Sequence, residues 1–164
     1  MIKKSTLFIF TFLTTCFINS KNIDHLVVPE NFEISIIAQD LDTPRQIAET
    51  DNGYLIVGSK KGNEITALID SDGDGNFEKH KTIANNLQNP TGVTYHKGDL
   101  YFAEIDTVWV IKEIDNWLDS NINSIPEKNM YMNNLPSDTW HGFKYIDFGP
   151  DGNLYIPVGV PCNI

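Results

Sequence analysis

The sequence has little cysteine and almost no arginine. Cys16 and Cys162 are its two cysteines, and every basic residue except Arg45 is a lysine. Two cysteines exclude a scaffold of several disulfides and a zinc site made of four thiolates. We expect Cys16 to leave with a signal peptide. An unpaired Cys162 in an exported protein then predicts a partner cysteine beyond the sequence.

Long apolar runs are also missing, since a bilayer-spanning helix needs about 20 apolar residues. The apolar run at residues 7–13 is much shorter and follows two lysines, an order typical of a secretory signal peptide. We therefore predict a signal peptide over residues 1–20, no integral membrane span, and a periplasmic or secreted protein. A lipoprotein anchor at Cys16 is the alternative.

Positive charge and phosphate-binding motifs are scarce as well. The formal net charge is −10 at pH 7, and an acidic surface repels phosphate backbones, which argues against nucleic acid as a partner. The sequence contains no glycine-rich phosphate loop, nucleophile elbow or Cys-x-x-Cys pair. Nucleotide cofactors held in a Rossmann unit are therefore unsupported.

What the sequence does contain is a repeat of short strands. Turns at Gly53, Gly98 and Gly152 each precede an alternating apolar run, and each follows another short apolar segment. The expected flanking strands are residues 45–48, 64–69, 92–95, 107–111 and 143–148. A unit of about 45 residues with several short strands is typical of a propeller blade. The sequence therefore predicts an all-β fold, a β-propeller with its first two to three blades, and a small β-sandwich is the alternative.

The expected propeller segment spans residues 21–164. Residues 116–136 are polar and rich in asparagine, so we interpret them as an insertion loop between blades. A propeller needs at least about four blades to close into a ring. Because residues 21–164 supply fewer, we expect a partial propeller, truncated at its C-terminus.

One cluster of carboxylates has the spacing of a calcium loop. Asp70, Asp72 and Asp74 occupy positions one, three and five, and glycine permits the sharp turn between them. Lys81 stands at position twelve, where calcium loops carry a glutamate. Two interpretations stay open: a calcium site that fixes the loop, or a plain hairpin turn rich in Asp and Gly.

Two polar side chains stand at the heads of repeat units. His141 precedes the third unit's first strand, where its imidazole could transfer protons at the mouth of a central channel. Gly142 would let a ligand approach the backbone. Arg45 holds the analogous place in the first unit, where a guanidinium could pair with a carboxylate ligand. A structural histidine and a surface ion pair are the alternatives.

Residues 140–164 resemble a segment of the glucose/sorbosone dehydrogenase family. Its members are soluble propellers that depend on pyrroloquinoline quinone (PQQ), with six blades in characterised examples. The shared pattern is His-Gly, an aromatic strand, Phe-Gly-Pro-Asp-Gly, Leu-Tyr and Val-Gly, and a Pro-Cys-Asn near the end resembles the sorbosone or aldose branch. The resemblance covers roughly residues 27–164, with further matches at residues 44–48, 70–75, 89–93 and 98–104.

The resemblance implies a quinoprotein oxidoreductase that acts on a sugar or related alcohol or aldehyde. His141 matches the general base that takes a proton from the substrate hydroxyl while a hydride passes to the quinone. PQQ and calcium are the implied cofactors, and we expect Arg45 and Gly142 to contact the quinone. Trp140 departs from the pattern, because glucose-oxidising relatives carry an aspartate there. We expect this segment to be inactive alone.

Two other functions fit a propeller. One is a non-catalytic propeller that binds a ligand or partner through its loops, since propellers host many roles. The other is a calcium-dependent lactonase, which needs acidic and asparagine ligands that converge on the central channel. The cluster that begins at Asp70 is expected on a blade hairpin instead, which favours the dehydrogenase.

Overall fold

The computed structural model describes residues 23 and 25–160 of the 164-residue chain. The chain falls into two compact units, residues 1–35 and 36–164. The predicted signal peptide, Cys16 and Cys162 lie outside the described residues. In the first unit, Leu26 N–H donates to the carbonyl of Ile23 and Phe32 N–H to that of Pro29, which form two tight turns. The strands found among the described residues all belong to the second unit.

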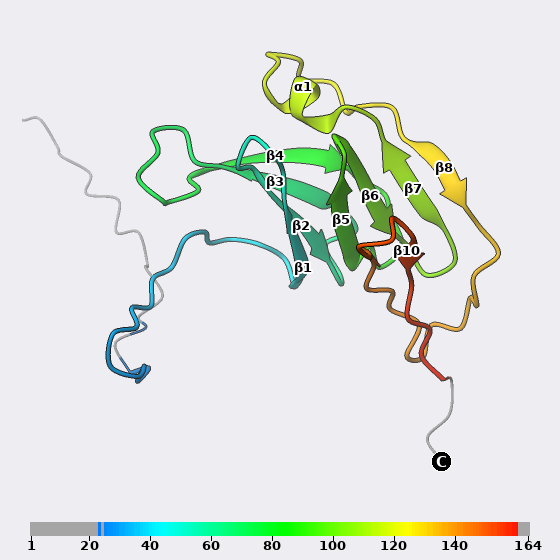
Figure 1. Ribbon diagram of the computed structural model, residues 1–164, viewed down its shortest axis with the longest axis horizontal. Coiled ribbons are helices and arrows are strands. Elements are labelled where there is room, and N and C mark those ends of the chain that lie inside the picture. Colours follow the sequence, from blue (N-terminus) through cyan, green and yellow to red (C-terminus); the bar gives the residue numbers. More distant parts are fainter. Residues whose placement is uncertain (1–22, 24, 161–164) are drawn as a thin grey trace, which may run out of the picture. The chain divides into compact units, whose positions relative to one another are not determined.

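Two four-stranded antiparallel sheets make up most of the second unit (Figure 1). In each sheet the strands lie in sequence order, so that every strand pairs with the next one along the chain. The first sheet consists of β1 (Pro44–Glu49), β2 (Leu55–Ser59), β3 (Ile65–Ile69) and β4 (Lys79–Ala84). The second sheet consists of β5 (Gly92–His96), β6 (Asp99–Ala103), β7 (Val108–Ile111) and β8 (Asn129–Met132).

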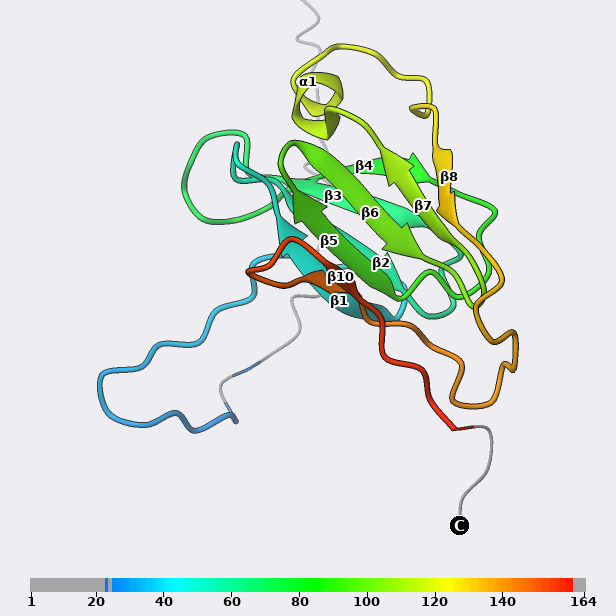
Figure 2. The ribbon, with the colours of Figure 1, turned by 45° about the vertical axis from the view of Figure 1, so that its right-hand side comes forward.

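A third sheet and one helix complete the unit. The third sheet pairs β9 (Asp147–Phe148) with β10 (Leu154–Tyr155), and the short helix α1 (Ile114–Leu118) follows β7. β1 packs against β5, and β5 packs against β9, so the first strands of three successive units lie side by side (Figure 2). Meandering sheets stacked in this way are successive blades of a β-propeller. The predicted all-β propeller is confirmed, with two four-stranded blades and part of a third.

Strand β6 shows why the blades pack so closely. Successive side chains of a strand point to opposite faces of its sheet. Leu100 and Phe102 pack in one buried cluster with residues of the first sheet, whereas Tyr101 and Ala103 pack in a second cluster with residues of the third unit. Both faces of β6 are therefore buried between neighbouring blades. This burial explains why β6 is apolar from Leu100 to Ala103 instead of alternating.

The predicted insertion loop over residues 116–136 is wrong in part. Asn129–Met132 forms the outer strand β8, and α1 extends to Leu118. All four residues of β8 are exposed, because the strand lies at the edge of its sheet and is held by backbone hydrogen bonds to β7. An edge strand of this kind carries no apolar alternation. The third unit also differs from expectation, because only Asp147–Phe148 of residues 143–148 is strand.

The turn at Gly98 illustrates the hairpins that join the strands. Lys97 and Gly98 connect β5 to β6, and both have positive φ angles, of 52° and 89°. A two-residue hairpin loop with two positive φ angles matches the twist of the flanking strands and favours glycine. Within the described residues, α1 is the one α-helix, and at five residues it is far too short to cross a membrane.

Candidate functional site

His141 lies in a turn six residues ahead of β9, the third unit's first strand. Its φ angle is 56°, and the neighbouring Gly142 N–H donates to the carbonyl of Thr139 at 3.4 Å. A positive φ is uncommon for a residue with a side chain, and such residues are enriched at functional sites. The imidazole is exposed, and its ring centre lies 5.0 Å from that of Trp140. The turn therefore presents His141 to solvent beside an aromatic surface.

One hydrogen bond determines how the His141 ring is oriented. Its Nδ1 lies 3.0 Å from the carbonyl oxygen of Val160. A carbonyl oxygen can only accept, so in this contact Nδ1 must carry the hydrogen. In the neutral ring, Nε2 then keeps its lone pair and can accept a proton. The geometry therefore places the ring hydrogen on Nδ1, against a backbone carbonyl, and leaves Nε2 as the acceptor.

Two glycines hold the chain close to His141. A Cβ at Gly159 would touch the carbonyl oxygen of His141 and lie 3.0 Å from its Cβ, so the segment that carries Val160 fits tightly against the turn. A Cβ at Gly142 would collide with the carbonyl oxygen of Asp138. The space that a side chain at Gly142 would need is thus occupied by the protein's own backbone. Contact between Gly142 and a cofactor stays a prediction.

Arg45 stands at the start of β1 with an exposed side chain. Its Nε donates to the hydroxyl of Tyr145 at 3.1 Å, and its guanidinium carbon lies 6.0 Å from the centre of the Tyr145 ring. Within the described part of the chain, Arg45 forms no salt bridge. The structure therefore joins Arg45 to Tyr145 of the third unit, which lies four residues after His141 in the sequence. It gives no direct contact between Arg45 and His141.

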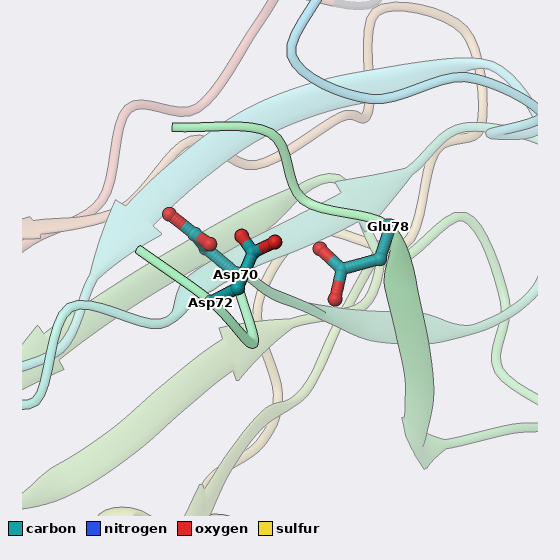
Figure 3. Close-up of side chains that lie close together, drawn as sticks. All are labelled: Asp70, Asp72 and Glu78. Carbon is teal, nitrogen blue, oxygen red and sulfur yellow. The ribbon is translucent and has the colours of Figure 1, made fainter. Parts of the chain in front are cut away.

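The predicted calcium loop is the connection between β3 and β4. Figure 3 shows the carboxyl groups of Asp70, Asp72 and Glu78 close together, and one oxygen from each lies within 4.8 Å of the others. Calcium binds oxygen at about 2.3–2.6 Å, so two ligands of one ion lie up to about 5 Å apart. The three carboxylates therefore fit a shared calcium ion in both chemistry and spacing.

Backbone hydrogen bonds prepare Asp70 for such a role. Its two carboxylate oxygens accept from the N–H groups of Gly75 at 2.9 Å and Gly73 at 2.7 Å, and these bonds lower the pKa of Asp70. Hydrogen bonding by the Ser71 side chain is the main cause of a lowered pKa of Glu78, and the backbone N–H of Ser71, at 3.3 Å, adds to it. Both groups are consequently ionised at neutral pH.

Asp74 lies outside this group of three. Its carboxylate accepts hydrogen bonds from the backbone N–H of Asn76 at 2.7 Å and from the Asn76 side chain at 3.0 Å. Glu78 takes part instead, although the sequence analysis did not select it, because calcium loops carry their glutamate at position twelve and not at position nine. The carbonyl of Val160 was missed for another reason: a backbone acceptor leaves no mark on the residue type.

The comparison with protein families gives one match, and it covers most of the chain. Residues 19–162 match the family described as "Domain of unknown function (DUF7133)". An uncharacterized protein of Borreliella burgdorferi is 24% identical over 149 residues, which are 80% of this chain and 38% of that protein. The chain therefore spans well under half the length of this curated relative.

Solved structures with a similar fold include carbohydrate-active proteins. The PQQ domain of pyranose dehydrogenase from Coprinopsis cinerea, in its holo form, is 18% identical with a TM-score of 0.63 over 78% of this chain and 30% of that one. A calcium structure of the Trichoderma reesei family AA12 enzyme is 17% identical with a TM-score of 0.66, over 83% and 34%. A gluconolactonase from Xanthomonas campestris is 22% identical with a TM-score of 0.53, over 76% and 37%.

These identities, all below 25%, establish a shared fold. That fold occurs in a PQQ-binding sugar dehydrogenase domain and also in a lactonase. The family match covers far more than half of the sequence. The chain therefore belongs to the DUF7133 family, and it shares its fold with the PQQ domain of pyranose dehydrogenase and with a gluconolactonase.

Proposed function

We propose that the protein is a quinoprotein oxidoreductase that oxidises a sugar or a related alcohol or aldehyde, with His141 as general base. The observation that carries the proposal is the hydrogen bond from His141 Nδ1 to the Val160 carbonyl at 3.0 Å, which leaves Nε2 free to accept a proton. The fold supports the same chemistry, since it occurs in the PQQ domain of pyranose dehydrogenase.

In the proposed reaction, Nε2 of His141 accepts the proton of a substrate hydroxyl. The C–H bond at the same carbon then breaks, its electron pair leaves with the hydride, and the carbon becomes a carbonyl. PQQ, when bound, supplies the two-electron acceptor for that hydride. His141 becomes an imidazolium, which the Val160 carbonyl stabilises through Nδ1–H. Because the ring is exposed, the proton can return to water at the end of the cycle.

Arg45 is the residue of this chain best suited to hold the acidic cofactor. Its bond to Tyr145 uses Nε, which leaves the two terminal nitrogens of the guanidinium to bind a carboxylate in parallel. Tyr145 thus aims the guanidinium without neutralising it. Trp140, 63% exposed, adds an aromatic face beside the base on which a sugar ring could stack. Contact between the quinone and Gly142 belongs to the same proposal.

Calcium has a structural role in the proposal. Asp70, Asp72 and Glu78 would bind the ion and fix the connection between β3 and β4. Export to the periplasm or the medium is part of the proposal, because residues 1–20 resemble a secretory signal peptide. A small-molecule sugar or alcohol is its expected partner.

The proposal is tested by reconstitution of the full-length protein with PQQ and calcium. Dye reduction with a panel of aldoses is measured for the wild type, His141→Gln and the control His80→Gln, whose histidine is also exposed. We expect His141→Gln to lower kcat by about 10²–10⁴-fold, the usual contribution of a general base, and His80→Gln to match the wild type. Equal rates for all three would overturn the role of His141.

Two further outcomes separate the alternatives. Absence of both quinone binding and dye reduction would favour the non-catalytic propeller, which binds a ligand or partner through its loops. Hydrolysis of a sugar lactone without quinone would favour the lactonase chemistry named for one structural neighbour.

A further inference from the structure

Lys144 is a buried lysine that the proposed reaction does not use. Its side chain is 1% exposed, and its Nζ donates to the carbonyl of Gly142 at 2.6 Å and to that of Pro136 at 3.4 Å. Burial lowers its pKa, while the more distant carboxylates of Asp106 and Asp138 act in the opposite direction. Among the described residues, Lys144 forms no salt bridge. Its ammonium is therefore satisfied mainly by two backbone carbonyls.

These two carbonyls lie on either side of the turn that carries His141. Pro136 precedes the turn, and Gly142 follows His141 directly. A charged donor makes stronger hydrogen bonds than a neutral one, and more so in a buried site. The ammonium of Lys144 thus draws the two ends of the turn toward one point. The peptide that bears His141 is fixed at the carbonyl next to it.

The backbone of Lys144 is itself anchored to the second blade. Its carbonyl oxygen accepts from the hydroxyl of Thr91 at 3.1 Å, and Thr91 is fully buried. A Cβ at Gly92 would collide with the same carbonyl oxygen, so the backbones of β5 and of the segment around Lys144 are in close contact. A continuous set of contacts therefore runs from β5 through Lys144 to the turn of His141.

We propose that Lys144 is a positioning residue, which holds the His141 turn against the second blade and so fixes the imidazole of the base. This inference rests on the proposed function for its catalytic consequence, but its structural part concerns the His141 ring alone. Lys144 touches neither substrate nor cofactor in this role. Its effect passes through the carbonyl of Gly142.

Lys144→Met tests the inference, because methionine has a similar length and keeps the site apolar. Lys81→Met is the matched control: Lys81 is partly buried and donates to the carbonyls of Trp117 and Ser120, far in sequence from His141. Both variants of the full-length protein are made with ¹⁵N-labelled histidine. The readouts are solvent exchange of the His141 Nδ1 hydrogen and, in the holoprotein, kcat and KM.

We expect Lys144→Met to speed exchange of this hydrogen and to lower kcat by about tenfold or more with KM little changed, since small misplacements of a catalytic group are costly. Lys81→Met should leave both readouts as in the wild type. If Lys144→Met exchanged the Nδ1 hydrogen of His141 at the wild-type rate and kept the wild-type kcat, the positioning role of Lys144 would be overturned.

Thr91→Val decides the matter if Lys144→Met does not fold. It removes the hydroxyl that holds the Lys144 carbonyl and should speed exchange in the same direction, by a smaller factor. Unchanged exchange in a folded Thr91→Val protein would contradict the inference. A wild type without quinone-dependent activity would refute the proposed function, whereas the exchange readout would still decide the role of Lys144.

Discussion

Gln46 and Ile146 are joined by two hydrogen bonds. The side-chain Nε2 of Gln46 donates to the carbonyl of Ile146 at 2.8 Å, and its Oε1 accepts from the N–H of Ile146 at 3.2 Å. The same Oε1 accepts from the N–H of Val93 at 3.3 Å. One amide on β1 therefore satisfies backbone groups in β5 and in the residue just before β9. Arg45 is the neighbour of Gln46 in the sequence and contacts Tyr145, the neighbour of Ile146. The Gln46 amide therefore helps to position Arg45 against the third unit.

Replacing Gln46 should destabilise the protein strongly. Gln46→Leu leaves two N–H groups and one carbonyl without their partner, and each unsatisfied buried group costs about 1–3 kcal/mol. We expect the free energy of unfolding to fall by about 2–4 kcal/mol, measured by urea denaturation. The control Gln88→Leu alters an exposed side chain and should stay within about 0.5 kcal/mol. Equal unfolding midpoints for the two variants would contradict this role of Gln46.

Gly159→Ala should displace the base while the protein stays folded. The new methyl group would press on the carbonyl oxygen and Cβ of His141, which lengthens the bond from Nδ1 to Val160. We expect kcat for dye reduction to fall by about 10²-fold, the effect of an error near 1 Å in a catalytic group. Gly152→Ala is the control for backbone strain, because its φ angle of 78° disfavours alanine while no atom lies within 4 Å of the added methyl group. It should lower the stability of the protein and leave kcat unchanged. A lower kcat in Gly152→Ala with a wild-type kcat in Gly159→Ala would contradict this role of Gly159.

Calcium should raise the melting temperature of the protein, because an ion that binds only the folded state stabilises it. Asp70→Asn and Glu78→Gln each remove a carboxylate from the group of three and should abolish this rise. Asp74→Asn should keep it, because the Asp74 carboxylate is hydrogen-bonded to Asn76 and lies outside the group. Differential scanning calorimetry with calcium and with a chelator measures the effect. A variant at Asp74 that alone lost the response would favour the original spacing-based set of Asp70, Asp72 and Asp74.

The alkaline stability of the protein should depend on Tyr54. Its hydroxyl donates to Asp119, and this hydrogen bond, with burial and the nearby carboxylate charges, raises the pKa of Tyr54 to about 12. An unfolded tyrosine has a pKa of about 10. Because the folded pKa is the higher one, the stabilisation is complete below pH 10 and disappears as pH rises through about 12.

The comparison of wild type with Tyr54→Phe isolates this contribution. The difference in their free energies of unfolding should be constant below pH 10 and shrink from pH 10 toward 12. Tyr131→Phe is the control, because this exposed tyrosine donates to no carboxylate among the described hydrogen bonds. A difference between wild type and Tyr54→Phe that persists unchanged to pH 12 would show that the bond to Asp119 does not act in solution.

Inner strands, whose two faces are buried against neighbouring blades, could be predicted from the sequence. Strands at the outer edge of a blade could not. After its first residue, Asp99, β6 is apolar because both of its faces are buried, and the turn at Gly98 marks where it begins. β4 begins with four polar residues and β8 is exposed along its whole length, so neither has the apolar alternation on which a sequence-based prediction relies. Their pairing depends on backbone hydrogen bonds, which any residue except proline can donate.

The candidate site shows the same division. His141 could be selected because imidazole is a rare side chain with a suitable pKa range for proton transfer. Its partner is the carbonyl of Val160, which any residue at that position would provide, so the sequence carries no sign of it. The burial of Lys144 could not be predicted either, because a lysine between aromatic residues suggests an exposed position. Both relationships depend on the tertiary structure.

The tautomer of His141 is the most direct test of the proposed base. Nitrogen NMR of the histidine-labelled protein above the titration range of the ring distinguishes a protonated ring nitrogen from an unprotonated one. The hydrogen bond to Val160 predicts that Nδ1 carries the hydrogen and Nε2 the lone pair. A spectrum in which Nε2 carries the hydrogen would contradict the role of His141 as the base that receives the substrate proton.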